Sequence, residues 1–282
     1  MSDYEVRVMT AAEREQAVNM AAAEGWNPGH QDGPCFAAVD PEGFWGGFLD
    51  DQMIASISVV NYDEAFAFLG FYIVAPEFRG KGYGFQLWQS AIAHAGSRVI
   101  GLDGVVDQQE NYRTSGFELA YRNIRYGGVP GVAPAASPAF RYVVTRAPSK
   151  ELEDLDTGVF PASRTAFWDH WLTADGHITV EARSGNQLAA FGTLRPCRTG
   201  FKIGPLVASS PSAARGVLSH LLQRVPQGDS VFLDVPEPNP DARKLAENLG
   251  LSAVFETARM YRGSAPQLNT DHVFGVTTFE LG

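Results

Sequence analysis

The chain of 282 residues lacks the features that define several protein classes. It has only two cysteines, Cys35 and Cys197, which lie far apart and have no His or Cys partner at metal-ligand spacing, so we expect neither a disulfide framework nor a metal site. No run approaches the roughly 18 apolar residues that a membrane-spanning helix needs. The N-terminal residues carry acidic side chains and no apolar segment, so we expect no signal peptide, no membrane partner and a cytoplasmic location.

Positive charge is also scarce. The 22 Lys and Arg residues against 32 Asp and Glu give a formal net charge of −10, and the cationic residues form no stripe that could neutralise a phosphate backbone. We therefore expect no nucleic-acid partner. A hydrophobic content of 45% with 19% charged residues excludes a disordered or fibrous chain. The length is large for one hydrophobic core and favours two domains.

Residues 129–152 are rich in Pro, Ala and Ser and divide the chain near its middle. The segments 98–128 and 230–263, which lie at matching places on either side, resemble each other. Each has an apolar strand with Leu-Asp, a short helix, Gly with a large apolar residue, and a strand ending in Tyr. The matching positions are Leu102-Asp103 with Leu233-Asp234, Gly116-Phe117 with Gly250-Leu251, and Tyr126 with Tyr261. We predict a diverged duplication, with a first domain over residues 1–130, a linker over 131–150 and a second domain over 151–282.

The hydrophobic pattern of the first half predicts a mixed α/β domain with the element order βαβββαβαβ. Its predicted strands include residues 4–10, 43–50, 52–63 and 65–74, and its predicted helices include residues 11–24 and 84–95. Residues 272–282 are predicted to form a final strand that docks across the two halves.

Three glycines, Gly80, Gly82 and Gly84, lie between a predicted strand and a predicted helix. A helix N-terminus presents unpaired N–H donors and a partial positive charge, and glycines let an anion approach the backbone closely. Arg79 and Lys81 add full positive charges. The junction therefore predicts a phosphate or pyrophosphate site.

Two common phosphate loops do not fit this spacing. A Walker loop needs G-x-x-x-x-G-K-[ST], but Lys81 precedes the second glycine and no Ser or Thr follows it. A dinucleotide fingerprint needs G-x-G-x-x-G within a βαβ unit, whereas this loop reads G-x-G-x-G and follows four strands. A glycine-rich turn with no ligand is the remaining alternative.

The loop "VAPEFRGKGYG" resembles the pyrophosphate loop of the GCN5-related N-acetyltransferases (GNAT), whose pattern [QR]-x-x-G-x-[GA] follows a V-x-P strand exit. Arg79, Gly82 and Gly84 occupy the three signature positions. Downstream, "ENYRTSGF" is similar to the end of the family helix N-x-x-A-x-x-x-Y-x-x-x-G-F, with Tyr112 at the place of the family's tyrosine acid. Val105 and Gln108 stand at its Asn and Ala positions, while Asn111 lies next to the tyrosine. The resemblance is strong over residues 3–127 and weaker over 142–263.

This resemblance implies two tandem GNAT domains and direct transfer of the acetyl group of acetyl-CoA to an amine of a small molecule or to an exposed amino group. It implies that the pantetheine arm pairs with the strand that ends at Ile73 and Val74, and that an amide there faces the thioester. Tyr112 would give a hydrogen bond or a proton to the departing thiolate. The implied pyrophosphate contacts are Arg79, Gly80, Lys81, Gly82, Tyr83 and Gly84, with Asn111 as a further cofactor contact.

Residues 24–36 fall where the family builds its acceptor pocket, and Trp26 and Asn27 are candidate acceptor contacts. His30 and Asp32 in the same stretch are too few to hold a metal. An attacking amine must be neutral, so a base is needed. Carboxylates near the site are Asp63, Glu64, Glu77 and Asp107, but each sits where solvated or capping carboxylates are common, and none is selected.

The second half has complementary defects. It keeps Asn239, Ala242, Leu245 and Gly250 of the family helix, but Ala246 replaces the tyrosine. Ser212, Arg215 and Val217 align with the three loop positions, so the resemblance implies poor pyrophosphate binding there. We expect one competent, N-terminal domain in a monomer or homodimer. A non-catalytic acyl-CoA-binding or sensing protein, or an interaction scaffold, are the alternatives.

Overall fold

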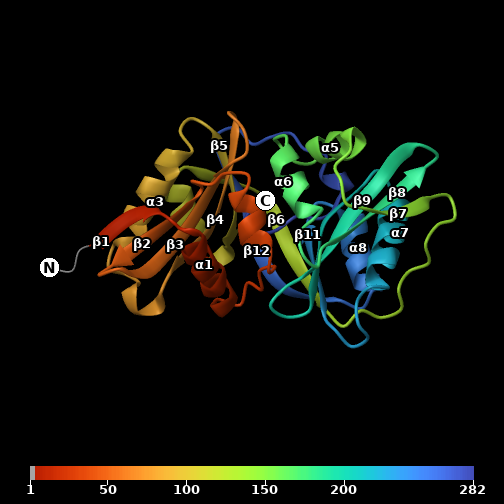
Figure 1. Ribbon diagram of the computed structural model, residues 1–282, viewed down its shortest axis with the longest axis horizontal. Helices are drawn as coiled ribbons and strands as arrows, with labels where there is room; N and C mark the ends of the chain where they lie inside the picture. Colours follow the sequence, from red (N-terminus) through yellow and green to blue (C-terminus); the bar gives the residue numbers. More distant parts are fainter. Residues whose placement is uncertain (1–3) are drawn as a thin grey trace.

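The computed structural model describes residues 4–282, and Figure 1 shows the course of the chain. The first half contains β1 (Tyr4–Val8), α1 (Ala11–Ala23), α2 (Asp32–Ala37), β2 (Phe44–Leu49), β3 (Gln52–Asn61), β4 (Phe66–Val74), α3 (Tyr83–His94), β5 (Val99–Val105), α4 (Gln109–Thr114) and β6 (Phe117–Gly128). Short 3-10 turns precede α3 and α4. We call residues 4–128 the first half. The predicted element order is confirmed, with α2 as an additional helix.

The second half, residues 141–282, repeats this order. It contains β7 (Arg141–Thr145), α5 (Lys150–Thr157), α6 (Thr165–Trp171), β8 (Ile178–Ser184), β9 (Gln187–Pro196), β10 (Phe201–Ala208), α7 (Pro211–Leu222), β11 (Val231–Pro236), α8 (Pro240–Asn248), β12 (Ser252–Arg262) and β13 (Val273–Gly275). The interval 131–150, expected to be a linker, includes β7, which pairs with β8. No helix within residues 4–282 is long and apolar enough to cross a bilayer.

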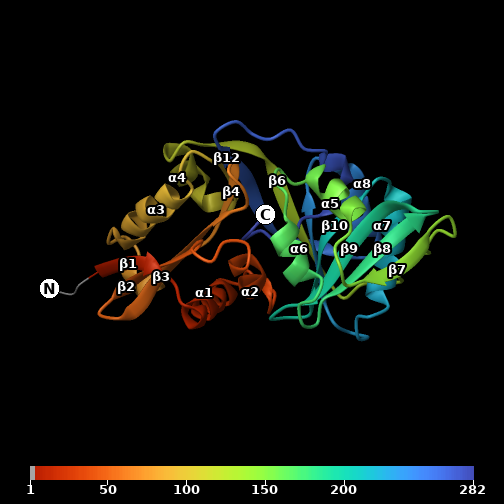
Figure 2. The same cartoon turned by 45° about the horizontal axis from the view of Figure 1, so that its top comes forward.

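Local sequence explains where α1 begins. The side chain of Thr10 accepts from the Glu13 amide, and the Glu13 carboxylate accepts from the Thr10 amide at 2.7 Å, which completes a capping box. Ala17, Val18 and Ala21 form its buried face, and their small size lets the helix lie close to β4. In Figure 2, α1 and α2 lie on one side of the first-half sheet, and α3 and α4 lie on the other.

All the strands join in one sheet, and the two halves exchange their last strands. The order is β1-β2-β3-β4-β5-β12-β6-β11-β10-β9-β8-β7, with β13 paired to β10. Strand β12, from the second half, pairs with β5 of the first, and β6, from the first half, pairs with β11 of the second. Strands β6 and β12 also pair with each other. Each half therefore lacks a complete sheet without the other.

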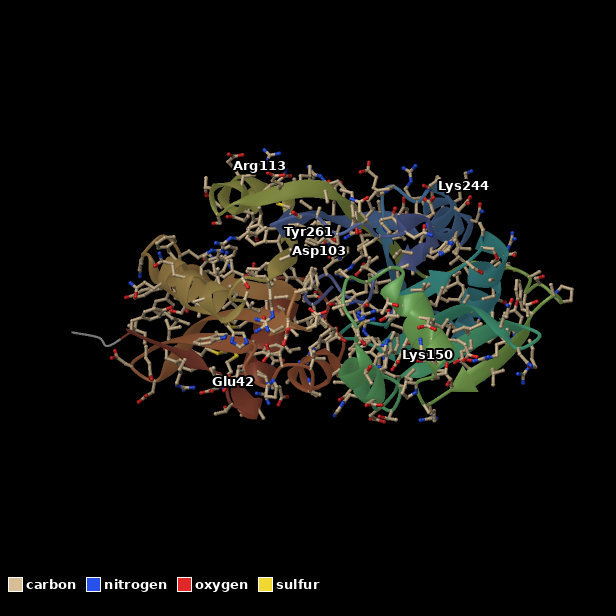
Figure 3. All side chains as sticks on the ribbon, turned by 90° about the horizontal axis from the view of Figure 1, so that it is seen from above. Glu42, Asp103, Arg113, Lys150, Lys244 and Tyr261 are labelled. Carbon is tan, nitrogen blue, oxygen red and sulfur yellow. The ribbon has the colours of Figure 1, made fainter. Side chains whose placement is uncertain are left out.

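Two buried ion pairs fix this exchange at equivalent positions. On β6, Arg125 lies opposite Asp234 of β11 and donates to its carboxylate at 2.6 and 2.7 Å. On β12, Arg259 lies opposite Asp103 of β5 and donates at 2.8 and 2.6 Å. Figure 3 shows Asp103 at the centre of the molecule. The repeated Leu-Asp of the sequence thus supplies, in each half, the carboxylate that binds an arginine from the other.

The final residues, predicted as a strand, form only the short β13, so the predicted extent is wrong while the docking across both halves is confirmed. Residues 276–282 continue without regular structure and are buried. The Tyr62 hydroxyl of the first half donates to the Leu281 carbonyl at 2.5 Å, and Arg164 of the second half donates to the Thr277 hydroxyl at 2.9 Å. We call residues 276–282 the C-terminal segment.

Replacing Asp234 by Asn should lower the free energy of unfolding by about 3–5 kcal/mol, because it leaves the buried Arg125 without its counter-charge. Burial alone would raise the pKa of Asp234, but Arg125 holds it below the ordinary carboxyl value. The pair therefore stabilises the fold fully above about pH 4, and this contribution is lost as the pH falls through the lower pKa of the folded state. Urea unfolding measures both effects.

The matched control is Asp154→Asn, which removes an exposed ion pair with Lys150 and should leave the unfolding midpoint unchanged. Equal stability of Asp234→Asn and the wild type at pH 7 would contradict the role assigned to the pair.

Candidate active site

Strands β4 and β5 diverge and open a cavity. They pair in parallel only from Phe66–Leu69 to Val99–Leu102. Beyond that point residues 70–74 stay paired with β3 on one edge, and their other edge, on the side of β5, has no strand partner among the residues described. A cavity of about 380 Å³ lies there, lined by both strands. Backbone N–H and C=O groups at a free strand edge can bind an extended ligand as an added strand.

Residues of both halves line this cavity. The first half contributes residues 69–74 of β4, residues 102–105 of β5, and side chains from α4 and the end of α1. The second half contributes Phe255 and Thr257 on β12, together with Phe279 and Glu280 of the C-terminal segment. The strand exchange places β12 next to β5, so the cavity exists only where the two halves meet.

A bulge in β4 turns its backbone at the floor of the cavity. The register with β3 shifts between Ser56 and Ser58, and Phe71 has a positive φ of 48°. The Ser56 hydroxyl donates to the Phe71 carbonyl at 2.7 Å and holds the bulge. Gly70 precedes it, and a Cβ there would lie 1.6 Å from the Glu280 carbonyl oxygen, so only glycine fits against the C-terminal segment. Bulges of this kind redirect backbone groups toward a site.

The glycine loop lies at the exit of β4. Gly80 and Gly82 have φ of 74° and 86°, and a Cβ on either would meet no atom within 4 Å, so backbone conformation rather than space requires them. Gly84 is different, because its Cβ would lie 2.7 Å from the Tyr72 hydroxyl and from a Val74 methyl group. Gly82 is the N-cap of α3 and provides no side-chain hydrogen bond, so the amides of the first turn remain available to an anion.

The two cations of the loop differ in their contacts. Arg79 lines the cavity, and its guanidinium donates to the Val74 carbonyl at 2.8 Å and to the Glu24 carboxylate at 2.5 Å. It ties the loop to both the strand exit and the end of α1. The exposed Lys81 ammonium lies 5.4 Å from the centre of the Phe78 ring. The loop thus combines free amides with two positive charges.

Tyr112 lies in the cavity wall on α4. Its ring stacks on Trp88, with centroids 5.9 Å apart, and only 8% of the residue is exposed. Gly104 makes room for it, because a Cβ there would lie 2.2 Å from the Tyr112 ring. Burial raises the pKa of Tyr112, with a smaller contribution from Tyr72. The hydroxyl therefore stays protonated at neutral pH and can act as a donor.

The second half has no equivalent opening. Strands β10 and β11 also pair only briefly, from Phe201–Ile203 to Val231–Leu233. Here β13 enters the gap, pairs with β10, and contacts β11. At the start of α7 the Ser210 hydroxyl accepts from the Ala213 amide, and Pro211, in the first helical turn, has no N–H. Residues of the chain itself therefore occupy both the gap between β10 and β11 and the N-terminus of α7.

The loop alignment expected for the second half is wrong. Ser212, Arg215 and Val217 lie within α7 and not in a loop that precedes it. Ala246, which replaces the tyrosine of the family helix, is fully buried on α8.

The predicted site residues fall into three groups. Those of the glycine loop, Gly80, Lys81, Gly82, Tyr83 and Gly84, follow Arg79 along the chain and lie outside the cavity wall. Ile73, Val74, Arg79, Tyr112 and Trp26 line the cavity. Asn27 instead contacts the second half: its amide donates to the Thr199 carbonyl at 3.0 Å and its carbonyl accepts from the Thr199 amide at 2.8 Å. Asn111 is exposed and donates to Gln108 at 2.6 Å. Neither lines the cavity.

The carboxylates considered as bases also lie elsewhere. Asp63, Glu64, Glu77 and Asp107 are absent from the cavity wall, and Asp63 accepts from the amides of Ala65 and Phe66 in a turn. Sequence reasoning missed the second-half residues of the wall, because nothing in the local sequence indicates a strand exchange. Among residues 4–282, no group of three His, Cys, Asp or Glu side chains could hold a metal ion.

Comparisons with known proteins agree with this geometry. Residues 10–117 match the acetyltransferase (GNAT) family, and residues 152–275 match an acetyltransferase (GNAT) domain. Holothin acyltransferase from Pseudoalteromonas sp. (strain SANK 73390) is 33% identical over 271 residues, which cover 96% of this chain and 92% of that protein.

Two solved structures share the fold over nearly the whole chain. A putative acetyltransferase from Pyrococcus horikoshii has a TM-score of 0.83 at 22% identity and covers 99% of this chain and 96% of its own. A tandem GNAT protein from the clavulanic acid biosynthesis pathway has a TM-score of 0.63 at 16% identity and covers 94% of this chain and all of its own. The chain belongs to the GNAT superfamily as a tandem member, and it is an acyltransferase.

Proposed function

We propose that the protein transfers the acetyl group of acetyl-CoA to the amine of a small molecule, at one site in the first half. The observation that carries this proposal is the cavity between β4 and β5, whose wall runs from Arg79, the first residue of the glycine loop that leads into α3, to Tyr112. These are the two ends that an acyl-CoA must reach: an anion site for its pyrophosphate and a donor for its sulfur. The blocked gap between β10 and β11 supports a single site per chain.

In this proposal the pantetheine arm lies along the free edge of residues 70–74, and the pyrophosphate meets the amides that follow Gly82. Arg79 and Lys81 provide the counter-charge. The arm would pair with β4 as β13 pairs with β10 in the second half. An amide beside the bulge, at Ile73 or Val74, would face the thioester oxygen and stabilise the negative charge that develops there.

The chemistry requires little beyond position and hydrogen bonds. Holding the amine against the thioester makes a bimolecular step effectively unimolecular. The thiolate of CoA then leaves beside the Tyr112 hydroxyl. The ordinary pKa of a tyrosine is about 10 and that of a thiol about 8.5, so full proton transfer is uphill by about 2 kcal/mol. Burial raises the pKa of Tyr112 further, so its role here is to donate a hydrogen bond to the thiolate.

The cavity wall favours a compact acceptor. Trp26, Phe255 and Phe279 supply aromatic surface, and the volume of about 380 Å³ suits a small molecule. The relative at 33% identity is named holothin acyltransferase, which supports transfer of an acyl group to an acceptor molecule. A non-catalytic acyl-CoA sensor is the alternative, and a hydrogen-bond donor in the cavity wall such as Tyr112 favours the enzyme.

Replacing Tyr112 by Phe should lower kcat about 100-fold, because the leaving thiolate loses its hydrogen bond. The dissociation constant for acetyl-CoA should change less than about 2-fold, because the hydroxyl stabilises the departing thiolate and not the bound acetyl-CoA. Free CoA release with a panel of amines and calorimetric binding of acetyl-CoA measure the two quantities. Tyr126→Phe, which removes only a hydroxyl that contacts Glu247, is the control and should retain full activity.

In the wild type, activity limited by Tyr112 should persist as the pH rises through 10, because burial keeps the pKa of the Tyr112 hydroxyl above the ordinary value.

Tight binding of acetyl-CoA without turnover on any amine of the panel would contradict the enzyme and favour the sensor.

Replacing Gly82 by Ala should weaken acetyl-CoA binding at least 10-fold. A Cβ is strained at φ 86° by about 1–2 kcal/mol, so the loop must shift away from the conformation that aims its amides. Gly228→Ala is the matched control, because Gly228 has φ 93° and equally open surroundings but lies before β11 in the second half. Both variants should lose similar stability, and only Gly82→Ala should lose affinity. Equal affinity in the two variants would remove the loop from the binding site.

A further inference from the structure

Glu280 is a buried carboxylate without a hydrogen-bond partner in the part of the chain that the structure describes. Only 2% of the residue is exposed, yet within residues 4–282 neither carboxylate oxygen has a hydrogen bond, and no cation lies within ion-pair distance. Burying a polar group without a partner costs free energy, and a charged group costs more. The hydroxyl of Thr257 is buried and unpaired in the same way. Both residues line the cavity that contains Tyr112.

The position of Glu280 is set by both halves. Its carbonyl oxygen occupies the space where Gly70 lacks a Cβ, directly beside the bulge of β4. The next residue, Leu281, accepts from the Tyr62 hydroxyl and donates its amide to the Thr278 hydroxyl at 2.8 Å. Contacts this dense around an irregular segment hold the residue at one place, next to the proposed thioester position.

The other carboxylates of the cavity already have partners. Both oxygens of Asp103 accept from Arg259, and one also accepts from Asn123 at 2.8 Å. Glu24 accepts from Arg79. Of the three acidic residues in the wall, Glu280 alone has carboxylate oxygens that are both buried and without a hydrogen bond among the residues that the structure describes.

Two positive charges lie deep beside this carboxylate without bonding to it. Arg125 is committed to Asp234 and to the Trp26 carbonyl, and the Lys202 ammonium donates to the same carbonyl at 3.3 Å. Burial lowers the pKa of Lys202, while the negative charge of Glu280 opposes that shift. These cations offset part of the cost of an ionised carboxylate at this depth and leave its oxygens free for a ligand.

We propose that Glu280 is the catalytic residue that binds the acceptor amine and takes its proton, so that the second half supplies the base for the site of the first. This inference rests on the proposed function. The N–H of the amine donates to Glu280, with Thr257 as the neighbouring polar contact. The acceptor is therefore a small molecule with a primary or secondary amine beside an apolar or aromatic body.

The step balances with the groups named. The amine nitrogen attacks the thioester carbon, the C–N bond forms, and the nitrogen's proton passes to Glu280. As the C–S bond breaks, its electron pair leaves on the sulfur of CoA, where the Tyr112 hydroxyl stabilises it. After product release Glu280 returns its proton to solvent, and the thiolate takes up a proton from water. The products are the amide and CoA.

The test compares full-length Glu280→Gln with the wild type. Gln keeps the shape but cannot take a proton, so CoA release with the best amine of the panel should fall at least 100-fold, while the acetyl-CoA dissociation constant stays within 2-fold. The variant should melt no lower than the wild type, because it removes a buried charge without a partner. Glu237→Gln, an exposed change in the turn before α8, is the control and should match the wild type.

The outcomes are distinct. Turnover of Glu280→Gln within about 3-fold of an active wild type overturns this inference alone. A melting temperature several degrees lower would also overturn it, since it would show a structural partner for the carboxylate. A wild type that binds acetyl-CoA but acetylates no amine overturns the proposed function, and this inference with it.

Discussion

The reciprocal ion pairs between the halves are the constraint on which the rest of the structure depends. Asp103 and Asp234 occupy the same place in the two copies of the duplicated unit, and each binds an arginine from the other copy's last strand. A buried charge that loses its partner is strongly destabilising, so the ion pairs favour the exchanged arrangement of β6 and β12 over one that separates the charges. The exchange puts Phe255 and Thr257 beside β5, and in doing so it makes the cavity a joint product of both halves.

The duplication has led to different outcomes at its two strand gaps. Between β10 and β11 the chain inserts its own β13, which satisfies the free strand edge and fills the space. The residues after β13 then cross to the first half and cover one side of the gap between β4 and β5, which stays open. The same C-terminal region thus closes one site and completes the other. A half without a glycine loop, and with Ala246 in place of the tyrosine, thus still contributes side chains to the cavity wall.

Much of the fold and part of the candidate site could be predicted from the sequence, because these features depend on residues close together in the chain. The glycines at positive φ, the strand before them and the tyrosine near Gly116 all act within a short stretch of chain, so their pattern predicts their geometry. The strand exchange could not be predicted, because β6 and β12 occupy equivalent places in the two copies and neither sequence shows which half the strand joins. The long-range contacts of Asn27 with Thr199, and of the buried Asp32 carboxylate, which accepts from Arg195 at 3.0 Å, were not evident either, since both join residues more than 160 positions apart. Nothing in the sequence around Glu280 indicated a place in the cavity, because that place depends on the fold of the C-terminal segment.

We infer that each chain has one acyl-CoA site, built in the first half and completed by the second. A crystal structure with a non-hydrolysable acyl-CoA analogue tests it most directly. We expect one analogue per chain, with its pantetheine arm along residues 70–74, its pyrophosphate at the start of α3, and its acyl carbon between Tyr112 and Glu280. An analogue bound between β10 and β11 with β13 displaced, or an acyl group directed away from the shared cavity, would contradict it.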